Sequence, residues 1–274
     1  MMWMYSKLSQ PVKKVVLCLI SGLWTIGMQA QSDTMKVLNA FMVGVGTTNL
    51  LDTYLSPEKY RGTELRLMWQ SVREPNYSKW SREITIQGDV AFAGNRAGNG
   101  TEMAGMCNFC YAWHYNWHFA NHKLNLKLGG MADTNVGFIY NNRNGNNPAQ
   151  ARVYINLQPS AVASYQFILH GRPTFVRYEV AVPLVGLMFS PAYGQAYYEI
   201  FSEGNYDHNI VPTTTVSTPS LQQMLTLDYK LGRTTIRAGY LGDFQQSYVN
   251  NLKTHIYTHA LIVGFVKRFS FAKK

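Results

Sequence analysis

Residues 109–119 read FCYAWHYNWHF, with an aromatic ring at every second position. Successive side chains of a β-strand point to opposite faces of the sheet, so six rings share one face and small or polar side chains share the other. A soluble protein would have to cover the whole aromatic face with a core. A lipid bilayer supplies an apolar partner along its full thickness, and its interfaces favour Trp and Tyr. The stretch therefore predicts a strand in the wall of a transmembrane β-barrel.

The same two-residue period recurs in residues 83–92, 123–128, 176–184 and 221–231. Strands with one apolar and one polar face are typical of antiparallel sheets. We predict an all-β fold, an antiparallel up-and-down transmembrane β-barrel of about ten strands. Eight or twelve strands stay open, because Pro159 could divide one segment. The ten predicted strands are residues 35–48, 61–73, 80–94, 102–119, 122–140, 149–170, 173–187, 220–231, 233–246 and 254–270.

The predicted connections alternate in length. The first, third, fifth, seventh and ninth are longer and rich in Gly, Asn, Pro and Ser, whereas the fourth, sixth and eighth are tight and the second is intermediate. Short turns at one end and long loops at the other are typical of outer-membrane barrels, and an even strand number brings both termini to the short-turn, periplasmic end. The longest connection, about residues 188–219, is expected to be functional or disordered, and its aromatic half could cover the barrel mouth.

Composition agrees with a barrel and argues against a helical membrane protein. The 274 residues are 46% hydrophobic, 14% aromatic and only 15% charged, whereas about a quarter is charged in soluble domains. No segment after residue 30 approaches the roughly 18 consecutive apolar residues that a transmembrane helix needs. The net charge is +10, and removal of residues 1–30 would remove three lysines and no acids, leaving +10 − 3 = +7. Such a basic surface could face lipopolysaccharide phosphates, and export argues against nucleic acid as a partner.

The first thirty residues are expected to be a cleaved signal peptide. Three lysines precede an apolar segment at residues 15–28, which is too short to span a bilayer, and Ala30 offers a cleavage point. The mature barrel domain is then residues 31–274, and its expected lipid partners are lipopolysaccharide and phospholipid. Residues 265–271 carry aromatic rings at alternate positions and end the last predicted strand. This resembles the signal read by the barrel-assembly machinery, a further expected partner.

Several short motifs together carry a resemblance to a known family. They are LSPE at 55–58, GNGT at 98–101, GFIYN at 137–141, NNPA at 146–149, MFSP at 188–191, GYLGD at 239–243 and GFVK at 264–267. As a set they resemble an uncharacterised family of secreted Bacteroidetes proteins, known only as a domain of unknown function. The resemblance covers nearly the whole mature chain. It implies an outer-membrane barrel and carries no activity, cofactor or site residue.

The polar faces of the predicted strands should line the lumen. Eight-stranded barrels are about filled by their own side chains, and ten strands lie near that limit, so a plugged or very narrow lumen is predicted. The candidate lumen residues are Glu83, Gln87, Asp89, His114, Asn116, His118, Arg177 and Glu179.

No catalytic, cofactor-binding or metal site is predicted. Cys107 and Cys110 form C-x-x-C, but within a strand their Cα atoms lie about 10 Å apart, too far for a disulfide. His114 and His118 are about 13 Å apart along the same strand, too far for one metal ion. The Gly-rich residues 94–101 contain no lysine to reach a phosphate, and they are expected to form an external loop.

Three functions from different classes remain open. The favoured one is a non-enzymatic barrel, either structural or a narrow pore. The second is an outer-membrane lipid-modifying hydrolase, because His255 and His259 lie close in sequence to Ser247 and Asp243. The third is a secreted soluble β-sandwich that binds a ligand, although the unbroken aromatic face of residues 109–119 argues against it.

Overall fold

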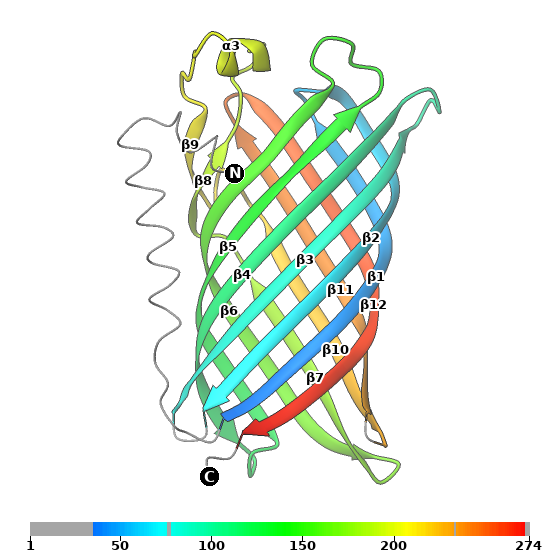
Figure 1. Cartoon of the computed structure of the whole chain (residues 1–274), viewed down its shortest axis with the longest axis vertical. Helices are drawn as coiled ribbons and strands as arrows, with labels where there is room; N and C mark the ends of the chain where they lie inside the picture. Colours follow the sequence, from blue (N-terminus) through cyan, green and yellow to red (C-terminus); the bar gives the residue numbers. More distant parts are fainter. Residues whose placement is uncertain (1–34, 76–77, 233, 272–274) are drawn as a thin grey trace, which may run out of the picture. The chain divides into compact units, whose positions relative to one another are not determined.

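The computed structural model describes residues 35–75, 78–232 and 234–271, which form a closed antiparallel barrel (Figure 1). Ten strands make the wall, and two more form a hairpin at one end. The first strand pairs with the last over its whole length, from Met35 opposite Phe271 to Asp52 opposite Thr254. The predicted all-β barrel of about ten strands is confirmed, and the β-sandwich alternative is wrong. The predicted signal peptide lies outside the described residues.

Eight of the ten wall strands have 16–21 residues, more than the 9–11 that cross a bilayer, whereas β7 and β10 have 10 and 11. Among the described residues the one helix, α3 (Tyr197–Phe201), has five residues, and no helix is long and apolar enough to cross a membrane. The strands are β1 (Met35–Asp52), β2 (Ser56–Pro75), β3 (Trp80–Asn95), β4 (Thr101–Phe119), β5 (Leu124–Asn141), β6 (Ala149–Leu169), β7 (Arg172–Ala181), β8 (Val185–Phe189), β9 (Ile210–Thr214), β10 (Leu221–Leu231), β11 (Thr234–Val249) and β12 (Leu252–Phe271).

The aromatic stretch forms β4 with the predicted faces. Trp113 and Phe109 are exposed on the outside of the wall, whereas Cys110 and His114 are buried inside. Trp80 of β3 packs against Trp113 and Tyr115 with ring centroids 6.4 and 5.2 Å apart. Aromatic pairs at such separations add about 0.5–1.5 kcal/mol beyond the area they bury. The rings therefore stabilise the outer surface of the wall.

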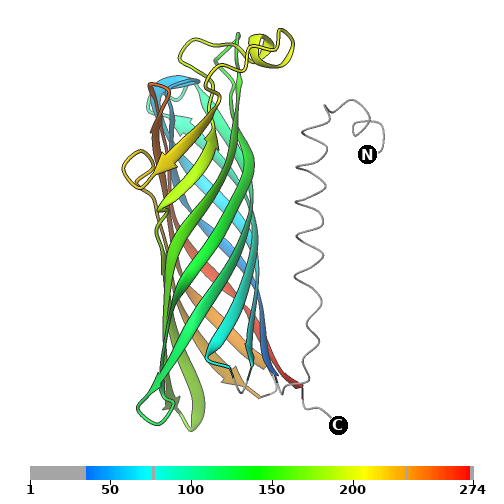
Figure 2. The same cartoon turned by 90° about the vertical axis from the view of Figure 1, so that its left-hand side faces the viewer.

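The two ends of the barrel differ in their connections. We call the end with both strand termini, Met35 and Phe271, the turn end, and the opposite end with α3 the loop end (Figures 1 and 2). Tight turns close the turn end, and residues 120–122, His170 and Gly171 adopt positive φ angles there. This agrees with the predicted tight connections.

Two of the connections predicted to be long are tight. Only residues 53–55 join β1 to β2, and only Asn250 and Asn251 join β11 to β12. Both asparagines have positive φ, near 51° and 61°, which is the geometry of a type I′ hairpin turn. The polar residues next to these turns continue the strand ladder beyond the apolar band. Polarity alone therefore made these strand ends resemble loops.

The strand that divides at a proline is not the one considered in the sequence analysis. Pro159 stays inside β6, opposite Gly130 of β5. Instead, the segment predicted as one strand at 173–187 divides at Pro183 into β7 and β8, which both pair with β6. The Pro159 carbonyl accepts from the Val182 amide at 3.4 Å. The nitrogen of Pro159, which carries no proton to donate, is on the same edge of β6 as this carbonyl. The regular β6–β7 pairing has already ended there, so no backbone hydrogen bond from Pro159 is required.

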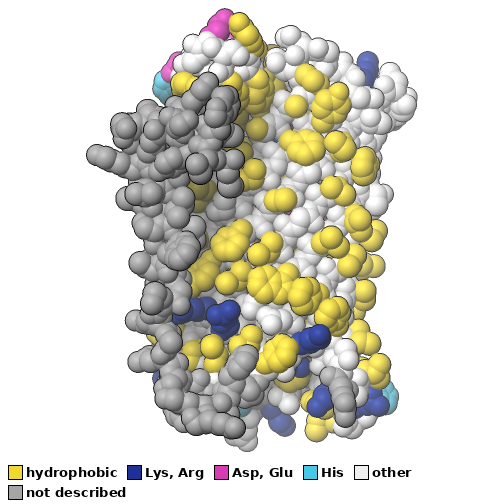
Figure 3. Space-filling model, in the orientation of Figure 1, with side chains coloured by type: hydrophobic (Ala, Val, Ile, Leu, Met, Phe, Trp, Pro, Cys, Tyr) yellow, Lys and Arg dark blue, Asp and Glu magenta, His cyan; other side chains and the backbone are white. Residues whose placement is uncertain are grey.

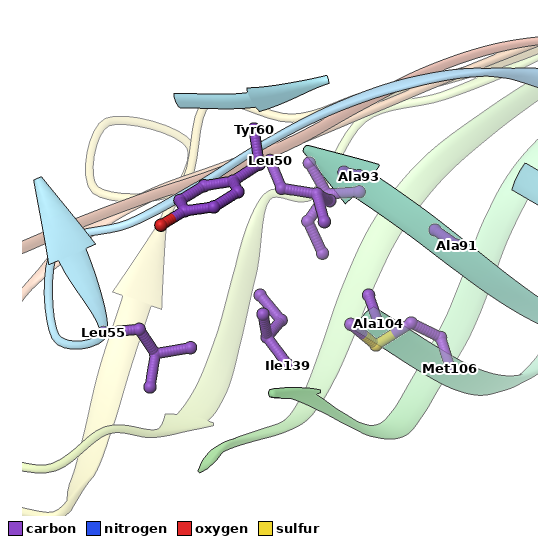
Figure 4. Packing of buried hydrophobic residues seen from close by; sticks show 9 residues of the cluster. Leu50, Leu55, Tyr60, Ala91, Ala93, Ala104, Met106 and Ile139 are labelled. Carbon is purple, nitrogen blue, oxygen red and sulfur yellow. The ribbon is translucent and has the colours of Figure 1, made fainter. Parts of the chain in front are cut away.

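A buried apolar cluster lies inside the barrel near the loop end. Leu55, Tyr60 and Ile139 reach into the same space from the β1–β2 turn, β2 and β5 (Figure 4). Tyr60 is 1% exposed, and its hydroxyl accepts from the Asn141 amide at 3.0 Å. The phenol is therefore buried with its polar atom satisfied, as buried tyrosines require.

One glycine is required where two strands approach closely. A Cβ at Gly264 of β12 would lie 1.9 Å from the Phe41 carbonyl oxygen of β1. We expect Gly264→Val to lower the free energy of unfolding by about 1–3 kcal/mol, since backbone must move to relieve the overlap. Urea-driven unfolding from lipid vesicles measures this. Gly130→Val is the matched control, because a Cβ there meets nothing within 4 Å. Equal losses for the two variants would contradict this explanation.

Candidate functional site: the barrel lumen

The inner face of the wall is polar and buried. Five of the eight predicted lumen residues are buried on this face: Glu83, Gln87, His114, Asn116 and Arg177. Asp89 is partly buried there, with its side chain 8% exposed. Glu179 is partly buried beside Arg177. His118 has the same strand parity but is exposed at the turn end, where its ring lies 5.1 Å from that of His122.

The inward side chains form alternating charged and apolar layers along the lumen, and β2 contributes to each of them. From the loop end to the turn end, its inward side chains are Tyr60, then Glu64 and Arg66, then Met68, then Gln70. Two charged layers are therefore separated by an apolar one. The members of the apolar layer are Ala40, Met42, Met68, Met224, Leu241, Ala260, Ile262 and Val266.

The charged layer nearer the turn end, the Arg177 layer, spans the lumen. The Arg177 guanidinium on β7 bonds the Glu83 carboxylate on β3 at 2.7 Å and also Glu179. Gln70 on β2 donates to both carboxylates, at 2.7 Å to Glu83 and 3.1 Å to Glu179. In the ring of ten strands β2 and β7 are five places apart. These contacts therefore join opposite sides of the wall.

The same layer continues to β10, β11 and β12. Arg237 donates to Gln70 at 2.6 Å, and it holds Asp228 with two bonds of 2.6 and 3.0 Å. Arg268 adds a bond of 2.9 Å to the same Asp228 carboxylate. Bidentate arginine–carboxylate pairs are among the strongest hydrogen bonds in proteins. The Arg177 layer therefore contains three arginines, Arg177, Arg237 and Arg268, and three carboxylates, Glu83, Glu179 and Asp228.

The second charged layer, the Arg66 layer, lies nearer the loop end. The Arg66 side chain is 2% exposed and contacts Glu64 at 2.8 Å, Asp243 at 2.9 Å and Asp89 at 3.3 Å. Gln87 accepts from the same guanidinium at 3.1 Å. One cation thus holds three carboxylates from β2, β3 and β11. A buried charge is tolerated only when it is paired and hydrogen-bonded, and each of these partners meets that need.

Several other inward polar groups bond to one another. His114 Nε2 lies 3.0 Å from the Ser160 hydroxyl, and the Ser81 hydroxyl donates to Asn116 at 2.9 Å. Lys127, 1% exposed, pairs with Glu74 close to the turn end. These side chains lie on the turn-end side of the Arg177 layer.

A short helix and its flanking loops cap the loop end. The Tyr54 hydroxyl donates to the Gln195 carbonyl at 2.9 Å, and the Tyr197 hydroxyl donates to the Gln150 side chain at 2.9 Å. Burial raises the pKa of Tyr197 to about 12, and burial also raises the pKa of Tyr54 above its ordinary value. Both phenols therefore keep their protons and remain hydrogen-bond donors. These bonds fix the predicted long loop over the mouth.

The residues considered for lipid hydrolysis do not come together. Ser247 faces the lumen, where its hydroxyl lies 2.6 Å from that of Thr254, and Asp243 is held by Arg66. His259 is on the outer face, and its Nδ1 lies 2.7 Å from the Tyr240 hydroxyl. The nucleophile and the base of a catalytic triad must lie within hydrogen-bond reach. Both histidines have the opposite strand parity to Ser247, and His255 Nε2 lies 3.0 Å from the Asn49 side chain instead, which prevents this.

Within the described residues, the cysteines form no disulfide and no metal-binding cluster is present. Cys107 is exposed and Cys110 is buried, and both are free thiols. They lie on opposite faces of β4, as strand geometry predicts. Among the described residues no group of three or more His, Cys, Asp or Glu side chains could hold a metal ion.

Several central lumen residues were absent from the candidate lumen residues predicted from sequence. These are Glu64, Arg66, Gln70, Asp228, Arg237, Asp243 and Arg268. A signal for some of them was present, because Arg66 lies between Leu65 and Leu67, which face outward. The rule that located Glu83 would therefore have located Arg66. The strand pairings that bring these charges together could not be read from spacing.

Comparison with known families gives one clear match. Residues 13–274 match the family described as "Protein of unknown function (DUF3316)". The chain belongs to this family. That membership confirms the resemblance to a family of unknown function, and the predicted Bacteroidetes origin stays a prediction. No curated protein matched this DUF3316 member.

Solved structures similar to this DUF3316 protein are outer-membrane barrels. The transport unit of the autotransporter AIDA-I from Escherichia coli aligns with a TM-score of 0.51 at 8% identity, over 89% of this chain and 92% of that one. The translocator domain of the autotransporter NalP from Neisseria meningitidis gives 0.43 at 10% identity, over 93% and 97%. The outer membrane protease OmpT from Escherichia coli gives 0.44 at 5% identity, over 90% and 100%. At such identities the likeness shows the fold alone.

Proposed function

We propose that this protein is a structural outer-membrane barrel of a Gram-negative bacterium, with a closed lumen and no enzymatic activity. The observation that carries the proposal is the Arg177 layer, because Gln70 and Glu179 join opposite sides of the wall. Such contacts occupy the cross-section through which a solute would pass. The barrel then serves as a rigid anchor that holds the cap and loops of the loop end outside the cell.

The outer surface supports residence in a membrane. Large apolar side chains cover it, including Phe41, Leu67, Phe92 and Leu261, each at least 46% exposed. Figure 3 shows hydrophobic side chains spread over the face of the wall in view, with most of the visible Lys and Arg towards the turn end. Soluble monomers rarely expose apolar patches larger than a few hundred Å². A bilayer in contact with lipopolysaccharide and phospholipid removes this surface from water.

Export and assembly follow from the same proposal. Residues 1–30 would direct secretion and be removed, and β12 would carry the recognition signal for the barrel-assembly machinery. Both termini of the barrel are at the turn end, so this end would face the periplasm. The exposed lysines and arginines near that end would then lie at the inner leaflet.

Conductance in planar lipid bilayers tests the closed lumen. We expect the folded wild-type barrel to show no steady single-channel current, because buried ion pairs and the apolar layer fill the lumen. A matched sample of a water-filled porin, inserted by the same procedure, verifies the recording. Insertion of the barrel is verified by its resistance to added protease. Reproducible ohmic steps from the wild-type protein would contradict the closed lumen and favour the narrow-pore alternative.

A further inference from the structure

The strand ladder of the wall is interrupted on one side near the loop end. β10 pairs with β11 only from Leu231 opposite Thr234 to Leu221 opposite Phe244. Residues 245–249 of β11 pair with β12, and the described pairings give them no strand on the other side. There the hairpin of β8 and β9 continues along β6 instead. We call the interruption between β9 and residues 245–249 the seam.

A short loop, residues 215–220, bridges the seam with few bonds. The Gln246 amide donates to the Ser220 hydroxyl at 3.0 Å, and that hydroxyl donates to the Gln246 carbonyl at 3.3 Å. The Tyr248 amide donates to the Ser217 carbonyl at 2.8 Å. A regular antiparallel pair would hold the same length of β11 with backbone bonds from a strand. The seam is thus the part of the wall held by a loop.

Two hollows of opposite chemistry lie on the two sides of the wall at the seam. The inner one faces the lumen and is lined largely by polar side chains, among them Arg152, Asn156 and Gln245. The outer one faces the membrane side and is lined mainly by apolar and aromatic groups, including Val182, Pro219 and Tyr257. Both hollows are lined by Ser220, Leu221 and Phe244, so these three residues alone are common to the two sides.

The inner hollow contains a cation with unused bonding capacity. Arg152 is 2% exposed, and its Nη1 donates to the Thr254 hydroxyl at 2.7 Å, whereas its Nε has no partner. Leaving a buried charged donor unsatisfied is costly. The carboxylate that attracts Arg152 electrostatically is Asp52 of β1, but no hydrogen bond joins the two side chains. Of the two acids that line the hollow, Asp243 is held by Arg66 at 2.9 Å, and Asp133 accepts from Asn108. A carboxylate entering this hollow would therefore find a guanidinium N–H ready to donate.

We propose that the seam is a binding site for a single-chain fatty acid. Its alkyl chain lies in the outer hollow against Leu221 and Phe244, and its carboxylate passes Ser220 to reach Arg152. The fatty acid matches both hollows because it is the simplest membrane amphiphile with an anionic head. The proposal rests on the membrane residence proposed above and not on the closed lumen. Failure of membrane insertion is detected separately, by fractionation.

Photo-crosslinking with diazirine-labelled palmitic acid tests the site. The purified full barrel is placed in phosphatidylcholine nanodiscs, and labelled peptides are identified by mass spectrometry. We expect labels to concentrate in residues 215–221 and 244–259. Leu221→Trp, which fills the outer hollow, should reduce that labelling about tenfold. Leu225→Trp is the matched control, because Leu225 is exposed on the same face of β10. Labels spread evenly around the wall, or an equal loss in both variants, would overturn the proposal.

The head group is tested with Arg152→Gln and two probes. Loss of a charge-assisted bond should weaken crosslinking of diazirine palmitic acid about tenfold. Crosslinking of the matching diazirine hexadecanol, which has no charge, should stay unchanged. A heat-dependent gel shift verifies that the variant is folded. Unchanged palmitic acid labelling, or an equal loss with both probes, would overturn the assignment of the carboxylate to Arg152.

Discussion

Replacement of Arg66 by methionine is expected to lower the free energy of unfolding by about 3–5 kcal/mol. Methionine has a similar length but no charge, so Glu64, Asp89 and Asp243 would remain buried together without their shared cation. Removing one partner of a buried ion pair is costly because the remaining charge cannot recover its water. Unfolding by urea from lipid vesicles, followed by Trp fluorescence, gives the free energy.

The control for this variant is on the same strand. Arg61 of β2 has the opposite parity and is exposed. Arg61→Met should change the free energy of unfolding by no more than about 0.5 kcal/mol. If Arg66→Met behaved like Arg61→Met, the Arg66 layer would not be the buried network described above.

Replacement of Arg177 by methionine is expected to cost a similar amount, about 3–5 kcal/mol, for a different set of contacts. It would leave Glu83 and Glu179 unpaired in the layer that crosses the lumen. Arg96→Met in the exposed β3–β4 loop is the control and should be nearly neutral. The same urea titration measures both. An unchanged free energy of unfolding in Arg177→Met would contradict a stabilising role for the ion pairs that cross the lumen.

The two layers share no partner in their ion pairs, so the two variants can be combined. Arg66 and Gln70 are four residues apart on β2, about 13 Å along a strand. Changes separated by more than about 7–10 Å usually add within about 0.5 kcal/mol. We therefore expect Arg66→Met and Arg177→Met to be additive in the double variant. A strong departure from additivity would indicate that the apolar layer transmits strain between them.

The sequence predicted those parts of the fold in which side chains alternate with the two-residue period of a strand. The aromatic stretch at 109–119 fixed both faces of β4, since only alternate positions of a strand share a face. Polarity misplaced the strand ends, because residues 49–52 and 247–249 are polar or mixed and still paired. The sequence could not show that a strand divides at Pro183 and not at Pro159. That outcome depends on where the pairing of β6 with β7 ends, which the sequence does not reveal.

The candidate site was predictable to a smaller extent. Alternation placed Glu83, Gln87 and Arg177 on the polar face. It could not predict which side chains they would bond to across the lumen. The partners lie far apart in the chain, such as Gln70 with Glu179 and Arg66 with Asp243. Those pairs depend on strand order and stagger in the closed barrel. The seam was equally hidden, because it exists only where β9 and β11 fail to pair.

Heat-dependent migration of outer-membrane protein on gels tests the central claim most directly. The full precursor is expressed in a Gram-negative host, outer membranes are isolated, and samples are run with and without boiling. A closed barrel resists detergent until it is heated, so we predict that the unboiled protein sediments with the outer membrane and migrates faster than the boiled form. Protein found in the soluble periplasm or the medium, with no shift on boiling, would contradict a closed barrel in the outer membrane.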